Sequence, residues 1–262
     1  MLVDSHCHLD FEDFDADREA VLTRARAAGV GLMVTISTKI TLADKIIALA
    51  EAHEDVVCSV GIHPHEAGSE PETPASEIVR LSAHPKVVAI GETGLDYYYG
   101  HSPREAQQRN FRAHIVAARE TGLPLIVHAR DADTDTADIL EDEMKNGTFP
   151  GLIHCFTAGP ELAKRALDIG FYISISGIAT FKNAETLRQT ILTVPEDRLL
   201  VETDSPYLAP IPHRGKRNEP SFVADTAVAL ADLFDTNFET LAARTTDNFY
   251  RLFTKAPSRE IA

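Results

Sequence analysis

Short apolar segments recur along the whole chain, separated by longer stretches of mixed polarity. There are eight of them, spaced roughly 28 residues apart. Most are continuous apolar runs, which is typical of parallel strands covered on both faces. They lie at residues 2–3, 32–36, 56–62, 87–90, 125–127, 152–153, 171–175 and 199–201. The pattern predicts eight buried strands.

Between the apolar runs, apolar residues return at every third or fourth position, which is the spacing of one helix face. A loop is expected at residues 66–76, which contain Pro71 and Pro74. Helical stripes begin at Val21, Ile40, Phe111 and Leu162, and a helical tail runs from Val223 to about Phe253.

Eight strands alternating with helices predict an α/β fold, a closed (β/α)8 barrel with a short C-terminal helical tail. A doubly wound open sheet is the alternative. The chain has 262 residues, and barrels of this kind run to about 250 residues. Since no linker or low-complexity tract divides the chain, we expect residues 1–262 to form a single domain.

Composition narrows the class of protein. The chain has 40 acidic and 25 basic residues and a net charge of −15, which argues against a protein that coats nucleic acid. Its three cysteines favour the reducing cytoplasm over a disulfide framework. No apolar run approaches the roughly 18 residues of a membrane span, and the first residues do not read as a secretory leader.

Polar residues follow most of the apolar runs. In a (β/α)8 barrel the loops after the strands converge on one axis, so these residues are expected to meet there. His6 and His8 follow the first run and, because side chains alternate along a strand, point to the same side. Two neutral imidazoles so placed can chelate a metal ion, although a lone pair of this kind also occurs in structural roles.

Glu92 follows the fourth run, where a buried carboxylate is costly unless it is paired or binds a metal. It can bridge two cations; a salt bridge to Arg130 is the alternative. His128 and His154 follow the fifth and sixth runs, and either alone could be a core histidine. Asp204 follows the eighth run and could bind a metal or accept a proton from a bound water.

Taken together, these residues lie at the same end of the predicted barrel. Six such groups suit two divalent ions bridged by a carboxylate and a water. Nitrogen and oxygen donors leave Zn, Mn, Mg, Ni or Co as the metal. The candidate ligands are His6, His8, Glu92, His128, His154 and Asp204.

With these residues identified, the chain resembles the TatD family of metal-dependent deoxyribonucleases, which belongs to the amidohydrolase-like barrels. The resemblance extends from Asp4 to about Pro220. Ala158 and Thr93 depart from the family pattern, which affects loop shape and substrate fit but removes no ligand. The matching segments are DSHCHLD (4–10), GIHPH (61–65), GETGLDYY (91–98), HARDA (128–132), HCFT (154–157), ETDSPYL (202–208) and RGKRNEP (214–220).

The resemblance implies hydrolysis of DNA phosphodiester bonds, from the 3′ end and preferentially in single strands. It places the family's metal ligands on the same six residues, with two divalent ions per subunit. We expect Glu92 to bridge the metals and Asp204 to act as the base. His63 and His65 match family positions that support the ligands or face the substrate, although a structural role is also open.

Substrate contacts are expected from cationic and aromatic residues near the strand ends. Arg214, Lys216 and Arg217 could hold backbone phosphates together with Arg130. Tyr98 and Tyr207 could stack on bases, whereas Tyr97 and Phe156 are expected to pack the loops. DNA is the expected partner, with weak, metal-dependent and salt-sensitive binding, and no stable protein partner is evident.

Three alternative functions remain. A metal amidohydrolase acting on an amide, lactone or nucleobase would use the same barrel, but many of those bridge their metals with a carbamylated lysine. Here the bridge is Glu92, and none of runs four to six ends in lysine. A non-catalytic metal-stabilised binding protein would unfold without metal. A Schiff-base aldolase would need Lys39 or Lys182, which both look solvated.

Overall fold

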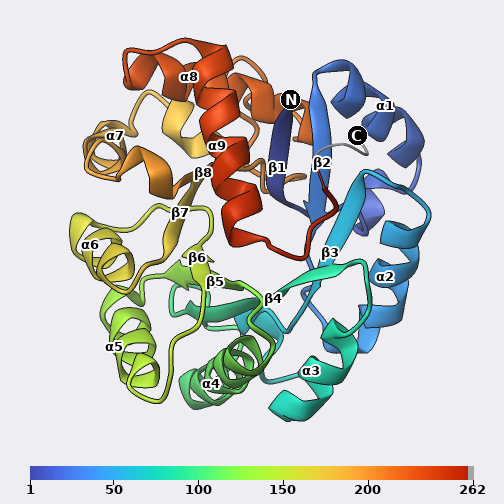
Figure 1. The fold of residues 1–262 in the computed structure, drawn as a ribbon, viewed down its shortest axis with the longest axis vertical. Coiled ribbons are helices and arrows are strands. Elements are labelled where there is room, and N and C mark those ends of the chain that lie inside the picture. The colour runs from blue at the N-terminus through green and yellow to red at the C-terminus, as the bar shows by residue number, and fades with distance from the viewer. Residues whose placement is uncertain (259–262) are drawn as a thin grey trace.

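Eight parallel strands form the centre of the computed structural model, which describes residues 1–258 (Figure 1). Their order in the sheet is their order in the chain. They are β1 (Leu2–Cys7), β2 (Val30–Thr35), β3 (Val56–Val60), β4 (Val87–Asp96), β5 (Leu125–Arg130), β6 (Gly151–Ile153), β7 (Tyr172–Ile175) and β8 (Leu199–Val201). Each predicted apolar run thus forms or overlaps a strand.

The ring of strands closes just beyond the end of β8. The Asp204 N–H donates to the His6 carbonyl at 2.8 Å, and the His8 N–H donates to the Ser205 carbonyl at 2.8 Å. These bonds join the chain after β8 to the end of β1, so the first and last strands are neighbours. The predicted (β/α)8 barrel is confirmed, and the open sheet is excluded.

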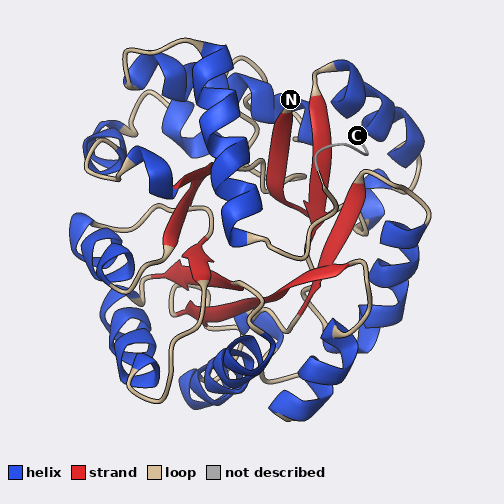
Figure 2. Cartoon of the chain, in the orientation of Figure 1, coloured by secondary structure: helices blue, strands red, loops and turns tan. Residues whose placement is uncertain are grey.

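Helices surround the strands on the outside (Figure 2). The predicted stripes correspond to α1, α2, α4 and α6, whereas α3, α5 and α7 were not predicted, although Ile78 and Leu81 share the buried face of α3. The bounds are α1 (Arg18–Ala27), α2 (Ala43–Glu51), α3 (Ala75–Ser82), α4 (Arg104–Thr121), α5 (Asp133–Met144), α6 (Pro160–Asp168), α7 (Glu185–Ile191), α8 (Val223–Leu233) and α9 (Phe238–Leu252).

The predicted helical tail consists of two helices, α8 and α9. Asn237 separates them and caps α9, since its side chain accepts a bond from the Thr240 N–H at 2.8 Å. In Figure 1, α9 lies across the opening of the barrel. Its Phe249 and Phe253 pack against the side chains that fill the barrel interior, such as Val34 and Leu200. The tail therefore closes the end of the barrel where the strands begin.

Strands β4 and β5 are longer than their apolar runs, so Glu92 and His128 lie within strands rather than after them. Two glycines permit this extension. A Cβ on Gly94 would lie 2.1 Å from the His128 carbonyl oxygen, and one on Gly61 would lie 2.5 Å from the Gly91 backbone. Only glycine allows the backbones to approach so closely. The expectation that the polar residues follow the strands is corrected at these two positions and at His6, which lies within β1.

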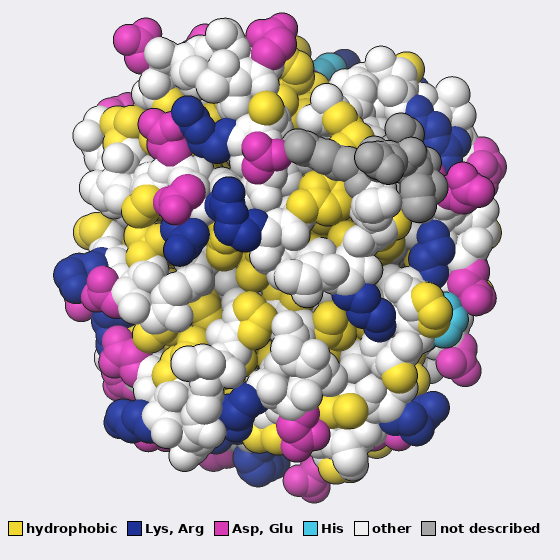
Figure 3. All heavy atoms as spheres, viewed as in Figure 1, with side chains coloured by type: hydrophobic (Ala, Val, Ile, Leu, Met, Phe, Trp, Pro, Cys, Tyr) yellow, Lys and Arg dark blue, Asp and Glu magenta, His cyan; other side chains and the backbone are white. Residues whose placement is uncertain are grey.

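The face across which α9 runs shows no continuous patch of one charge. Lys and Arg side chains are interspersed with Asp and Glu in Figure 3. None of the helices that the structure describes is long and apolar enough to cross a membrane.

Candidate metal centre

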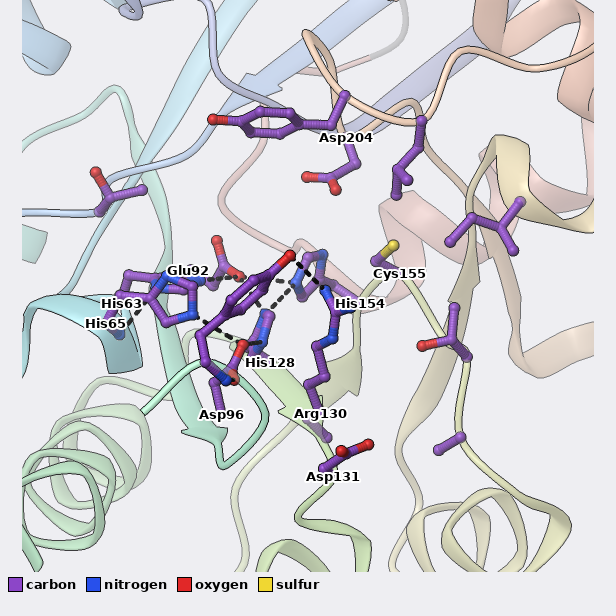
Figure 4. A pocket seen from close by; sticks show the side chains of 18 of the residues that line it. His63, His65, Glu92, Asp96, His128, Arg130, Asp131, His154, Cys155 and Asp204 are labelled. Atoms are coloured by element: carbon purple, nitrogen blue, oxygen red, sulfur yellow. Dashed lines mark hydrogen bonds and ion pairs between the residues drawn. The ribbon is translucent and has the colours of Figure 1, made fainter. Parts of the chain in front are cut away.

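A cavity of about 850 Å³ opens at the ends of the strands opposite α9. Five of the six predicted ligands line it, namely His8, Glu92, His128, His154 and Asp204. The sixth, His6, lies beneath them and is fully buried. The structure thus gathers all six residues from β1, β4, β5 and the segments after β6 and β8. Figure 4 shows most of them around one centre.

Glu92 occupies the middle of this centre, and histidines surround both of its carboxylate oxygens. Its Oε1 lies 2.7 Å from His154 Nε2 and 3.1 Å from His128 Nδ1. His63 Nε2 approaches the same oxygen to 3.4 Å. The other oxygen, Oε2, lies 3.4 Å from His6 Nε2. A carboxylate that faces histidines on two sides can bridge two cations, and these histidine contacts replace the salt bridge to Arg130 that was the alternative.

Four atoms of the centre are buried without a hydrogen-bond partner. Two of them, His6 Nε2 and Glu92 Oε2, face each other at 3.4 Å. Orphaned buried polar atoms are costly, which calls for an unseen partner. Two ligand atoms of a tetrahedral ion, each about 2.1 Å from the metal, lie about 3.4 Å apart. The spacing and the donor types therefore fit a divalent metal ion.

Asp204 faces the same side as the His6 and His8 pair. Its Oδ1 lies 3.4 Å from His8 Nε2 and 3.7 Å from His6 Nε2. Asp204 adopts a left-handed backbone conformation with φ of 58°, which aspartate tolerates better than most residues. The bond from its N–H to the His6 carbonyl holds the residue there.

Two carboxylates that the motifs contained, but to which we assigned no role, support the histidines. Glu202 Oε1 accepts the Cys155 N–H at 2.6 Å and lies 3.3 Å from His154 Nδ1. Asp96 Oδ2 lies 3.1 Å from His128 Nε2 and 2.8 Å from His65 Nε2. Carboxylates that fix the second nitrogen of a histidine are common behind metal ligands. Their only sequence signal was that they lie in the same motifs as Glu92 and Asp204.

Among the described residues, three groups of ligand atoms are close enough to hold an ion. Glu202 belongs to one of these groups. Its Oε2 is also buried without a hydrogen-bond partner and is therefore a further candidate metal ligand atom. The groups are His6, His8 and Glu92; His63, Glu92 and His128; and His6, His154 and Glu202.

The surroundings keep the central carboxylates ionised. Burial raises the pKa of Glu92, but the charges of the neighbouring histidines outweigh it and hold that pKa well below its usual range. Burial likewise raises the pKa of Asp204, yet His8 and the adjacent histidines lower it overall. Burial lowers the pKa of His154, whereas Glu92 and Glu202 bring it well above the usual range. Ionised carboxylates suit both metal binding and proton acceptance.

The histidine pair that follows β3 lies in the wall of the cavity. His63 reaches Glu92, as described above, and its Nδ1 accepts the His65 N–H at 3.0 Å. Burial lowers the pKa of His63 to about 4, so its imidazole is neutral at neutral pH. His63 is thus close enough to Glu92 to act as a ligand itself, while the His65 imidazole lies beside Asp96, which also contacts His128.

The predicted substrate-binding cations fall into two groups. Arg130 lines the cavity, whereas Arg214, Lys216 and Arg217 lie outside its lining. Arg217 forms an ion pair with Asp17 at 2.8 Å, and the Arg214 guanidinium lies 4.3 Å from the centre of the Phe181 ring.

The aromatic residues also differ in their surroundings. Tyr207 lines the cavity and is 54% exposed. Phe156 is buried, and the Tyr97 hydroxyl donates to Asp135 at 2.7 Å, so both pack the loops as expected. Tyr98 is exposed but lies outside the lining of the cavity, which its neighbour Tyr99 joins instead. The sequence reasoning did not consider Tyr99.

Comparison with known proteins agrees with the geometry. A sequence model of the family described as TatD related DNase matches residues 3–254. The metal-dependent hydrolase YcfH of Escherichia coli K12 is 48% identical over 255 residues, covering 96% of this chain and 95% of that protein. A Pantoea ananatis protein named 3′-5′ ssDNA/RNA exonuclease TatD is 35% identical over 259 residues, covering 96% of this chain and 99% of that protein.

A solved structure shows the same similarity in three dimensions. The crystal structure of YjjV, a TatD homologue from Escherichia coli K12, superposes with a TM-score of 0.89 and 30% identity. The match covers 97% of this chain and 98% of that one. The chain therefore belongs to the TatD family of metal-dependent hydrolases.

Proposed function

We propose that this protein is a deoxyribonuclease that removes nucleotides from the 3′ end of single-stranded DNA, using two divalent metal ions. The observation that supports this best is the Glu92 carboxylate, whose two oxygens face different histidines. The relative named as a 3′-5′ ssDNA/RNA exonuclease supports the choice of substrate. A chain with three cysteines and no strong disulfide signal suits the cytoplasm, where we place the reaction.

The residues divide into two sets around Glu92. His6, His8 and Asp204 would hold one ion together with Oε2, and His128 and His154 would hold the other together with Oε1. When bound, such ions polarise a phosphoryl oxygen and lower the pKa of a bound water toward roughly 7. Zn, Mg, Mn, Ni and Co all remain compatible with these donors.

The chain's own groups would then prepare the reaction. Asp204 is ionised and borders the cavity, so it would accept the proton of the attacking water. Glu202 holds His154 by Nδ1 and leaves its Nε2 directed at Glu92. Arg130 would neutralise a backbone phosphate at the rim of the cavity. Arg214 and Lys216 would neutralise phosphates farther along the DNA strand.

A degradation assay on 5′-labelled single-stranded DNA tests the proposal. With Mg, Mn or Zn, the intact protein should shorten the oligonucleotide stepwise, and a chelator should stop it. The variant Glu92→Gln should lose more activity than the 10–100-fold typical of residues that only support metal ligands. The matched control is Glu66→Gln, which changes another carboxylate of the cavity wall, one paired with Lys39.

Two results would overturn the proposal. Metal-loaded protein that leaves both free and blocked 3′ ends intact but hydrolyses a lactone or amide would be a metal amidohydrolase. Protein that unfolds on chelation and has no activity when loaded would be a metal-stabilised binding protein. No lysine lines the cavity among the described residues, which counts against both the carbamylated-lysine bridge and the Schiff-base mechanism.

A further inference from the structure

One wall of the cavity carries an exposed aromatic surface that the metal centre does not use. Tyr99 lines the cavity and is 51% exposed. The His101 ring stacks beside it, with centroids 5.4 Å apart and an interplanar angle of 16°. The Arg130 guanidinium lies 4.7 Å from the centre of the Tyr99 ring. We call Tyr99, His101 and Arg130 the stacking shelf.

The loop that carries Tyr99 is hydrogen-bonded to a carboxylate that also contacts the candidate metal centre. Asp96 Oδ1 accepts the backbone N–H groups of both Tyr98 and Tyr99 at 3.0 Å. Its other oxygen contacts His128 and His65. The same buried carboxylate therefore positions the loop that carries Tyr99 and a candidate metal ligand. An aromatic ring fixed in this way binds a flat ligand with little loss of conformational freedom.

Charge around the shelf limits what can lie on it. Asp131 and Asp133 line the same part of the cavity, and their carboxylates would repel a phosphate that continued past Arg130. The 3′-terminal nucleotide of a DNA strand has no phosphate beyond its own 3′ hydroxyl. It therefore suits this wall better than an internal nucleotide.

The opposite wall carries a second exposed aromatic side chain, Tyr207. In Figure 4, Asp204 lies on the other side of the histidine cluster from Arg130 and Asp131. Tyr207, three residues after Asp204, is exposed there. The cationic segment 214–217 runs back to it, since Asn218 Nδ2 donates to the Tyr207 carbonyl at 2.5 Å. A DNA backbone that continues upstream past this wall would meet the exposed Arg214 and Lys216 beyond the cavity lining.

We propose that the stacking shelf binds the base of the 3′-terminal nucleotide, and that Tyr207 lies beside the nucleotide before it. The inference rests on the proposed function. Stacking on one aromatic ring typically changes nucleic-acid affinity by roughly 5- to 150-fold. Because every base has a flat face, the shelf would hold any terminal base.

The first test compares oligonucleotides that end in an ordinary 3′ nucleotide or in a 3′ abasic residue. The wild type should lose at least about tenfold in kcat/KM on the abasic end. Tyr99→Ala should be about tenfold slower on the ordinary end and nearly indifferent to loss of the base. Tyr98→Ala is the matched control. It also removes an exposed tyrosine that contacts Arg130, but Tyr98 lies outside the cavity lining. This variant should therefore still prefer the ordinary 3′ end over the abasic one.

The second test needs no turnover. The Asp204→Asn protein is mixed with metal and an oligonucleotide that carries 2-aminopurine at its 3′ end. Stacking should quench the fluorescence, and adding Tyr99→Ala should restore it while the oligonucleotide stays bound.

The outcomes separate the two proposals. If the protein neither binds nor cuts DNA, the proposed function fails. If it cuts DNA but the wild type ignores loss of the terminal base, or Tyr99→Ala leaves the quenching intact, the shelf is wrong and the nuclease stands. If Tyr207→Ala alone removes the discrimination at the terminal base, the assignment of the two walls is overturned.

Discussion

Single carboxylates organise the candidate centre at the scale of residues. Glu92 contacts the histidines directly, while Glu202 and Asp96 contact the far nitrogens of His154 and His128. A histidine held at one nitrogen has a defined ring orientation at the other, which raises its value as a metal ligand. The centre is thus prepared by hydrogen bonds before any ion binds.

A buried histidine outside the centre makes stability depend on pH. His114 is fully buried, and its Nε2 accepts the Ile62 N–H at 3.1 Å. Burial lowers its pKa to about 4, below the roughly 6.5 of an unfolded chain. The unfolded state therefore takes up the proton first. The contribution of neutral His114 to the free energy of unfolding is complete above about pH 6.5. As the pH falls toward 4, this contribution is lost, which lowers the free energy of unfolding by about 3 kcal/mol.

Urea unfolding of the wild type and His114→Gln at several pH values between 7.5 and 4.5 measures this effect. The difference between the two proteins at each pH isolates this histidine from the other titrating groups. We expect the stability of the wild type to fall more steeply with acid than that of the variant. Parallel curves would show that His114 does not carry the effect.

At the scale of elements, the end of the barrel opposite the cavity depends on α9. Phe249 is 1% exposed, packs against the side chains inside the barrel and stacks on Phe253 at 4.3 Å. Replacing it with alanine leaves a cavity there. We expect Phe249→Ala to lower the free energy of unfolding by about 3–5 kcal/mol.

Chemical denaturation of Phe249→Ala checks this value, with the exposed α9 residue Glu239 as the control. Glu239→Ala should change stability by no more than about 0.5 kcal/mol. Since the metal centre lies at the other end of the strands, the activity per folded Phe249→Ala molecule should be retained. A wild-type unfolding curve for Phe249→Ala would contradict the role of α9 as the closure of the barrel.

For the whole molecule, net charge and local charge act in opposite directions. The net charge of −15 repels DNA, so the proposed function requires that metal ions and a few cations bind the substrate. Arg214 and Lys216 are exposed, whereas the charge of Arg217 is already paired with Asp17. We therefore expect Arg214 and Lys216 to contribute more to DNA binding than Arg217.

Salt titration of single-stranded DNA binding, followed by fluorescence anisotropy, tests this inequality. With two or three phosphates neutralised, affinity should fall about 7- to 20-fold between 50 and 200 mM salt. The double variant Arg214→Gln, Lys216→Gln should flatten this dependence, while Arg217→Gln should leave the slope nearly unchanged. An equal effect of Arg217→Gln would show that its ion pair with Asp17 opens on binding.

The sequence alone determined the architecture and the candidate ligands. Strand and helix periods are local properties of the chain, so the runs and stripes predicted the barrel. α3 and α5 were missed although each buries apolar residues three positions apart, because α3 is short and α5 is rich in acidic residues. The six candidate ligands could be predicted because residues at the ends of parallel barrel strands converge on one axis regardless of loop conformation.

Only the tertiary structure decided which groups interact. Three interactions depend on contacts between segments far apart in the chain. Glu202 supports His154, Asp96 joins His128 to the loop that carries Tyr99, and Asp17 pairs with Arg217. The extension of β4 through Asp96 likewise depends on how closely Gly94 approaches β5. Side-chain direction and choice of partner follow from packing, which no local pattern encodes.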